Sequence, residues 1–222
     1  MVRTESRTEL FDRLAVVGKA FASPKRLVLL DLLAQGERTV DSLAREAEMG
    51  LTTVSAHLQI LKLSHLVRTR RDGTRIFYRL AGDDVASLYA TMREVAGTYS
   101  ADVETALRSY LGGPGLDDVE QVTREELLER MRQGAVVLWD VRPAEEYAAS
   151  HLPQARSVPF SELVEAKDLD PADEVIAYCR GAWCVMAHDA VRLLRDRGIA
   201  ARRLEGGMLE WRSAGHPVEV GA

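Results

Sequence analysis

Apolar residues recur at helical spacing through much of the first half of this 222-residue chain. Four segments carry the pattern and are predicted to be helices: residues 6–21, 24–35, 40–47 and 51–61. Ser23 followed by Pro24 is typical of a helix start, and Gly36 is typical of a helix end.

The third and fourth predicted helices are short and are joined by a tight turn. This pairing fits a helix-turn-helix, whose second helix enters the major groove of DNA. Val54, Leu58 and Leu61 are expected to bury one face of that helix. We expect His57 to cap the helix, to touch a phosphate or to contact a base. The polar residues left on other faces are candidate DNA contacts: Thr52, Thr53, Ser55, His57, Gln59 and Lys62.

Two runs of alternating polar and apolar residues follow, separated by Asp72-Gly73, which predicts a β-hairpin. Between Lys62 and Arg79 the chain carries cations with Asp72 as the single acid. A hairpin after two short helices predicts a winged helix-turn-helix. A basic hairpin can also be an ordinary solvated surface. The candidate DNA contacts on the hairpin are Arg70, Arg71 and Arg75.

The segment resembles the ArsR/SmtB family of dimeric bacterial repressors. The resemblance rests on Thr53-Val54-Ser55, His57-Leu58, Leu61, Leu66-Val67, Asp72-Gly73 and Tyr78-Arg79-Leu80. It implies binding to double-stranded operator DNA. Gly50, Leu51 and Ala56 depart from the usual polar residues, so few base contacts are expected. Residues 1–111 contain no cysteine, so the family's thiolate metal site is missing, and we expect neither a metal nor a cofactor.

A long apolar stripe over residues 83–110 predicts one further helix. Through the resemblance, we expect this helix and residues 6–21 to form a homodimer interface. Packing of the stripe against the rest of the same chain is the alternative. Residues 112–116 are rich in glycine and proline and are predicted to be a linker. The predicted domains are therefore residues 1–111 and 117–222.

Strands and helices alternate in the second domain, which predicts an α/β fold with a parallel sheet. Residues 135–139 and 174–178 are apolar runs typical of buried strands. The fold class is thus two domains, a mainly α winged helix-turn-helix and an α/β domain. Ligands of parallel sheets lie beyond the carboxyl ends of the strands, and Cys179 follows a predicted strand there.

Both cysteines of the chain, Cys179 and Cys184, bracket a tight turn from this strand to a helix over residues 185–197. Free N–H groups of the turn and of the helix start favour negative charge. A cysteine held there is expected to react as a thiolate, with Arg180 adding positive charge. Gly181 allows a positive φ at the turn. The alternative is a pair of unrelated buried thiols.

This half resembles the rhodanese family of sulfurtransferases. The matching segments are Leu138-Trp139-Asp140-Val141-Arg142, Glu145-Glu146-Tyr147, His151-Leu152-Pro153-Gln154-Ala155, Tyr178-Cys179-Arg180-Gly181-Ala182-Trp183-Cys184 and Leu204-Glu205-Gly206-Gly207. The resemblance implies that Cys179 is a nucleophile that carries a persulfide among the loop amides.

Other loop residues have roles that the sequence leaves open. Cys184 replaces a basic or hydroxyl residue of the family and is a candidate resolving thiol, joined to Cys179 by a disulfide or a sulfur bridge. Trp183 walls a pocket or simply packs, with Ala182 beside it. Asp140 and Arg142 either form an ion pair that supports the loop or act on substrate.

Charge divides the chain, with a net +2 over residues 1–111 and −7 over residues 112–222. The asymmetry indicates a polyanion partner for the first half only. The sequence has neither a long apolar run nor a signal peptide, so we expect a cytoplasmic protein without a membrane partner. A reducing compartment favours a reactive cysteine pair over a structural disulfide.

The leading hypothesis is therefore a DNA-binding regulator, a repressor that senses a small sulfur donor or an oxidant through Cys179 and Cys184. A sulfurtransferase whose DNA-binding domain serves autoregulation is the alternative. A sensor of arsenic or another soft metal ranks below both, because two thiolates make an incomplete site.

Overall fold

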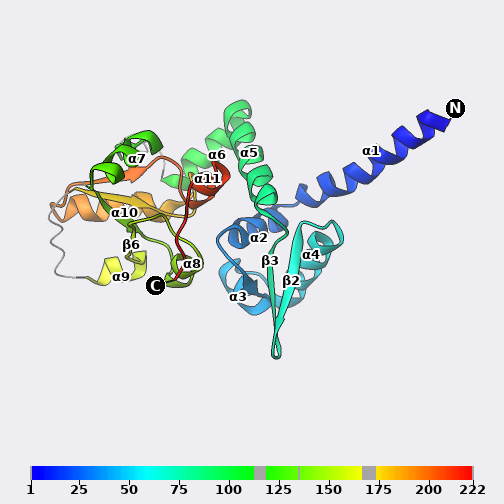
Figure 1. The fold of residues 1–222 in the computed structure, drawn as a ribbon, viewed down its shortest axis with the longest axis horizontal. Coiled ribbons are helices and arrows are strands. Elements are labelled where there is room, and N and C mark those ends of the chain that lie inside the picture. Colours follow the sequence, from blue (N-terminus) through cyan, green and yellow to red (C-terminus); the bar gives the residue numbers. More distant parts are fainter. Residues whose placement is uncertain (1, 113–118, 135, 167–173, 222) are drawn as a thin grey trace. The chain divides into compact units, whose positions relative to one another are not determined.

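The computed structural model describes residues 2–112, 119–134, 136–166 and 174–221 (Figure 1). Packing divides the chain into two compact units, Met1–Tyr89 and Ala90–Ala222. The division falls inside helix α5 (Asp83–Tyr99), whereas the sequence places the domain boundary near residue 111. Most of the predicted linker, residues 113–116, lies outside the described residues.

Unit 1 combines helices with a small antiparallel sheet of strand order β1-β3-β2. Its elements before α5 are α1 (Val2–Phe21), α2 (Pro24–Ala34), β1 (Arg38–Thr39), α3 (Val40–Glu46), α4 (Leu51–Leu63), β2 (Val67–Asp72) and β3 (Arg75–Leu80).

The β2–β3 hairpin is confirmed, and it extends beyond the helices of its unit (Figure 1). Asp72 pairs with Arg75 in the strand register, so the two-residue loop is Gly73-Thr74, one position later than Asp72-Gly73. Gly73 has φ = 58°, a left-handed conformation that glycine adopts without strain. The predicted winged helix-turn-helix elements are all present.

The core of unit 1 is built where the sequence pattern placed it. Val54, Leu58 and Leu61 of α4 are fully buried, and they pack with apolar residues of α2 and α3. By contrast, α1 leaves large apolar side chains exposed, among them Leu10, Leu14 and Phe11.

The prediction of one continuous helix over residues 83–110 is wrong. Helix α5 ends at Tyr99, and α6 (Ala101–Leu111) begins after Ser100. The Ser100 hydroxyl accepts a hydrogen bond from the Val103 N–H at 3.4 Å and so caps the new helix. Serine side chains compete with the helical hydrogen-bond ladder in this way, which makes them common at helix starts.

Unit 2 contains a five-stranded sheet of order β4-β8-β7-β5-β6 in which each recorded pair is parallel. The predicted parallel sheet is confirmed. The elements after α6 are β4 (Gln121–Val122), α7 (Arg124–Gln133), β5 (Val137–Asp140), α8 (Ala144–Ala149), β6 (Arg156–Ser157), α9 (Phe160–Glu165), β7 (Val175–Tyr178), α10 (Val185–Asp196), β8 (Ala201–Leu204) and α11 (Met208–Ser213).

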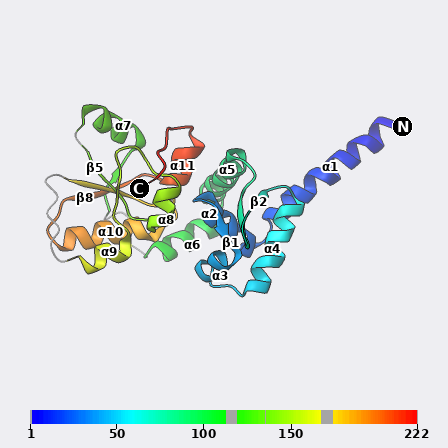
Figure 2. The same ribbon diagram turned by 60° about the horizontal axis from the view of Figure 1, so that its bottom comes forward.

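Helices cover both faces of this sheet (Figure 2). Successive residues of the central strand β7 point to opposite faces, so that Val175 and Ala177 pack with α9 and α10. Ile176 and Tyr178 pack with α7 and α11 on the other face. Burial on both faces explains the continuous apolar run of this strand. Within the described residues, no helix has the length and apolar character needed to span a membrane.

Candidate functional site: the cysteine loop and the DNA-binding face

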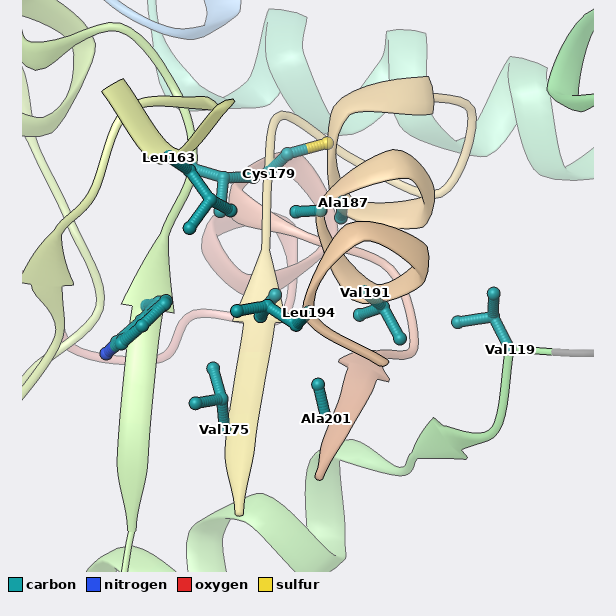
Figure 3. Close-up of a cluster of buried hydrophobic side chains, with 12 residues drawn as sticks. Val119, Leu163, Val175, Cys179, Ala187, Val191, Leu194 and Ala201 are labelled. Atoms are coloured by element: carbon teal, nitrogen blue, oxygen red, sulfur yellow. The ribbon is translucent and has the colours of Figure 1, made fainter. Parts of the chain in front are cut away.

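Cys179 follows the last residue of β7 and is almost fully buried, with 1% of its surface exposed. It continues the Val175–Ala177 side of the strand and joins the core under α10. Figure 3 shows its sulfur directed toward the first turn of α10. The sheet therefore places this sulfur at the carboxyl edge of its central strand, where parallel sheets bind ligands.

The two cysteines form a disulfide, with their Cα atoms 6.4 Å apart. This separation lies inside the range that disulfides ordinarily span. Cys184 is the residue that precedes α10, and its N–H donates to the Gly181 carbonyl at 3.0 Å. The structure thus selects the bonded pair from the arrangements that the sequence left open.

The first backbone N–H groups of helix α11 donate hydrogen bonds to the cysteine loop. The N–H groups of Met208 and Leu209 donate to the carbonyl oxygens of Cys179 (2.9 Å) and Arg180 (3.0 Å). A Cβ atom on Gly207 would lie 2.6 Å from the Gly181 nitrogen, so that only glycine permits this close approach.

Two of the loop amides already donate hydrogen bonds in the disulfide form. The Ala182 N–H donates to Glu210 Oε1 at 3.3 Å, and the Cys184 N–H donates to the Gly181 carbonyl. Gly181 itself does not have a positive φ. A Cβ atom at this position would lie 2.9 Å from a Glu210 carboxylate oxygen.

Arg180 does not direct its charge at the sulfur atoms. Its guanidinium forms an ion pair with Glu146, in which Arg180 Nε lies 3.0 Å from Oε1 and 3.1 Å from Oε2 of the carboxylate. Glu146 is buried, with 1% of its surface exposed. The positive charge is therefore largely compensated by a buried acid of α8. The contribution of Arg180 to the loop is to tie it to that helix.

Asp140 and Arg142 form a fully buried ion pair with an Nη2–Oδ2 distance of 2.6 Å. Arg142 also donates to the Ser150 carbonyl at 2.7 Å. Burial opposes the charge of Arg142, but the hydrogen bonds that it donates to Asp140 raise the pKa of the guanidinium overall. Asp140 is paired in register with Tyr178, directly before Cys179. The geometry is that of an internal support for the strand end.

Trp183 lies against the later part of α5. The Arg93 guanidinium carbon is 4.6 Å from the centre of its ring, and a Cβ atom on Gly97 would be 3.7 Å from its Cζ2. Arg93 is itself buried, with 7% of its surface exposed. Of the two roles predicted for Trp183, the structure therefore shows packing, against the later part of α5.

The predicted DNA-binding residues of α4 divide by exposure. Thr52, Ser55 and Lys62 are exposed, whereas Thr53 and His57 are half-buried. Burial first, and then the charges of neighbouring cations, lower the pKa of His57 and favour the neutral ring. Gln59 is exposed but donates to the Tyr78 hydroxyl of β3 at 3.5 Å.

The cations of the hairpin are exposed and are not equivalent. Arg70 forms an ion pair with Glu37 and lies over the Phe77 ring at 4.7 Å. Arg71 donates to the Gly73 carbonyl at 3.0 Å. Arg75, opposite Asp72, has no recorded ion pair within the described chain. The described parts of the chain hold no cluster of three or more metal-binding side chains.

Two family descriptions match the sequence: a bacterial regulatory protein of the arsR family over residues 23–69, and a rhodanese-like domain over residues 123–214. The HTH-type transcriptional regulator Rv0324 of Mycobacterium tuberculosis is 50% identical over 221 residues, covering 99% of this chain and 96% of that protein. The chain belongs to the ArsR family of transcriptional regulators. This regulator carries a rhodanese-like domain after its DNA-binding domain.

Solved structures match each half of this ArsR-family regulator. A homodimeric winged helix-turn-helix DNA-binding domain from Mycobacterium bovis is 51% identical and covers 43% of this chain and 89% of its own, with a TM-score of 0.41. A rhodanese-related protein from Thermoplasma volcanium is 27% identical and covers 45% of this chain and 97% of its own, with a TM-score of 0.40.

Three residues at the loop of this regulator were not predicted from its sequence as site residues. Glu146 lies within one of the segments that resemble the rhodanese family, and that resemblance was the signal that could have identified it. The structure shows that it is buried. Glu210 precedes Trp211 in α11 and gave no distinct signal. Arg93 interrupts the apolar stripe of α5, which is the signal that could have found it.

Proposed function

We propose that this regulator is a repressor whose affinity for operator DNA falls when the cysteine loop is oxidised or carries sulfane sulfur. The observation that carries the proposal is the joining of Cys179 and Cys184 at the carboxyl edge of the sheet. These are the only cysteines of the chain, and the chain is a transcriptional regulator. A bond that forms and breaks at this edge is a two-state element, as a sensor requires.

The chemistry needs a low-molecular-weight persulfide, RSSH, as the donor. The Cys179 thiolate attacks the outer sulfur, which leaves a Cys179 persulfide and releases the thiolate RS⁻. The Cys184 thiol then attacks the Cys179 sulfur, which forms the disulfide and releases hydrogen sulfide. Two equivalents of a reducing thiol return the pair to two thiols and become the disulfide RSSR.

DNA binding is assigned to the exposed polar face of α4 and to the hairpin. Thr52, Ser55 and Lys62 would lie against the major groove, with Arg71 and Arg75 on phosphates. A homodimer would place two such faces on successive turns of the duplex. Its support is the exposed apolar surface of α1, including Leu10 and Leu14.

The test measures operator affinity by fluorescence anisotropy at one fixed salt concentration. The duplex is first selected from a random-sequence library with the reduced protein. Reduced and persulfide-treated protein are then compared. We expect the treated form to bind at least about tenfold more weakly, a difference of ~1.4 kcal/mol, and a thiol reductant to restore binding.

The matched control is Cys184→Ser, which keeps the Cys179 nucleophile but cannot form the disulfide. If the disulfide is the switched state, the variant binds operator equally well before and after treatment. Equal affinity of the wild-type protein in both states contradicts the proposal. In that case, thiosulfate-to-cyanide turnover that disappears in Cys179→Ser would identify the sulfurtransferase alternative.

A further inference from the structure

We propose that Arg93 of α5 is a positioning residue of the cysteine loop, and that the loop acts on α5 through the Arg93–Trp183 contact. The inference rests on the proposed sensing function and specifies how that site is read. Arg93 lies outside both family matches, residues 23–69 and 123–214. Both residues of the contact lie in unit 2, and only Trp183 falls within a family match.

The contact is made by a buried guanidinium on the face of an indole ring. The Arg93 guanidinium carbon is 4.6 Å from the Trp183 ring centre, and Arg93 is 7% exposed. Gly97 lies one turn further along α5, and a Cβ atom there would be 3.7 Å from Trp183 Cζ2, an ordinary van der Waals distance. Cation–π contacts strengthen as the cation loses water, and Arg93 is buried although Trp183 is only half-buried.

Side chains of opposite charge approach the same point of the loop. The position that a Cβ atom of Gly181 would take is 3.4 Å from Arg93 Nη1 and 2.9 Å from Glu210 Oε2. Glu210 also accepts the hydrogen bond from the Ala182 N–H. Arg93 from α5 and Glu210 from α11 thus both lie beside the segment between the two cysteines.

Trp183 is directly linked to a cysteine whose bonding changes between the disulfide and dithiol forms. It immediately precedes Cys184, whose sulfur is bonded to Cys179 in the disulfide. Reduction by two equivalents of thiol releases Cys184 from that bond. The backbone of Trp183 must follow any displacement of its neighbour, and its ring lies on Arg93.

Helix α5 begins in unit 1, which contains Tyr89, and continues into unit 2, which contains Arg93. Tyr89, Arg93 and Gly97 are spaced by four residues and share one face of this helix. Tyr89 is buried in unit 1, where its hydroxyl is 3.2 Å from the Asp31 carboxylate of α2. A rigid helix carries a displacement at Arg93 to Tyr89, one turn earlier.

The test compares full-length Arg93→Gln with wild-type protein and with Arg108→Gln. The control variant removes the same charge from an exposed pair with Glu104 on α6. Operator affinity is measured for the dithiol and disulfide forms of each protein, and thiol titration verifies the state of the cysteines. Tryptophan emission is recorded in parallel, with Trp183→Phe identifying the contribution of Trp183.

We expect Arg93→Gln to form the disulfide and, in its dithiol form, to bind operator as the wild-type protein does. The ratio of operator affinities between its dithiol and disulfide forms should fall below about threefold, equivalent to ~0.7 kcal/mol. The Trp183 emission change should also shrink. Arg108→Gln should keep the wild-type ratio. A wild-type ratio in Arg93→Gln overturns the inference.

Two further outcomes remain decisive. If Arg93→Gln fails to fold, Trp183→Leu removes the ring from the other side of the contact and should abolish the ratio in the same way. If wild-type operator affinity is equal in both forms, the proposed sensing function fails. The emission arm then decides the contact alone, because an unchanged Trp183 signal in Arg93→Gln overturns it independently of DNA.

Discussion

The two units of this regulator use polar side chains in opposite ways. Unit 1 exposes its candidate contacts, such as Arg71 and Arg75, on a small apolar core. Unit 2 buries several charged groups in pairs, as in Asp140–Arg142 and Glu146–Arg180. An exposed charge acts on a partner molecule and costs little to remove, whereas a buried charge supports the fold and leaves an uncompensated partner when it is removed.

The largest effect should come from breaking the most buried pair. Arg142→Met leaves the Asp140 carboxylate buried without its cation, and we expect a loss of about 3–5 kcal/mol in the free energy of unfolding. Urea unfolding followed by tryptophan emission measures it, because all three tryptophans lie in unit 2. Arg108→Met, on an exposed pair, should lose under ~0.5 kcal/mol. Comparable losses in the two variants would contradict the contrast.

The buried side chain of His188 should make the stability of unit 2 depend on pH. It is 2% exposed on α10, and among the described residues neither ring nitrogen has a hydrogen-bond partner. Burial, followed by the charges of Arg203 and Arg192, lowers its pKa to about 4. Its ordinary pKa of about 6.5 returns on unfolding, so that the unfolded chain takes up a proton first as the pH falls.

The stability of unit 2 should therefore fall by up to ~3 kcal/mol between pH 6.5 and pH 4, and this contribution should level off below pH 4. Urea unfolding at several pH values measures the slope. His188→Leu should flatten it over that range, whereas substitution of the exposed His65 should leave it unchanged. A wild-type slope in His188→Leu would show that other groups dominate.

A hairpin cation should affect DNA binding without affecting stability. Arg75→Gln removes one expected phosphate contact, so that operator and nonspecific duplexes should both be bound more weakly. The dependence of log affinity on log salt concentration should lose about one unit of slope per protomer. Arg132→Gln on α7, an exposed arginine outside the DNA-binding and dimer-forming elements, is the matched control. Weakening confined to the operator would instead indicate base contact.

The smallest effect should come from the exposed Arg70–Glu37 pair. The hydrogen bond from Arg70 lowers the pKa of Glu37, so that the pair contributes above the ordinary pKa and is lost as the pH falls. Both side chains are substantially exposed, and Glu37→Gln should therefore change the unfolding free energy by less than ~1 kcal/mol. The same variant removes one of the two acids that pair with Arg70, the other being Asp72 at 3.3 Å, and operator affinity should rise slightly. An unchanged or lower affinity would place Arg70 away from the duplex.

Elements with a strong local pattern were predictable from the sequence. The apolar face of α4, the hairpin after it and the buried strand that ends before Cys179 all depend on periodicity or turn chemistry within a few residues. The break at Ser100 was missed because the apolar stripe continues across it. A single capping hydroxyl outweighed that pattern.

Contacts between distant segments were not predictable in the same way. Nothing near Glu210 in the sequence indicates that its carboxylate accepts the Ala182 N–H, 28 positions away. The pairing of Arg180 with Glu146 also depends on how α8 lies against the loop. The sequence predicts which residues are candidates for reaction, and the tertiary fold decides which charged side chains lie near them.

The bridge between Cys179 and Cys184 spans only five positions of the chain. Closing so small a ring removes little conformational freedom from the unfolded chain, on the order of 2 kcal/mol by the loop-entropy relation. Opening it therefore leaves most of the stability of unit 2 in place. A disulfide that closes so small a ring can form and break repeatedly while the protein around it stays folded.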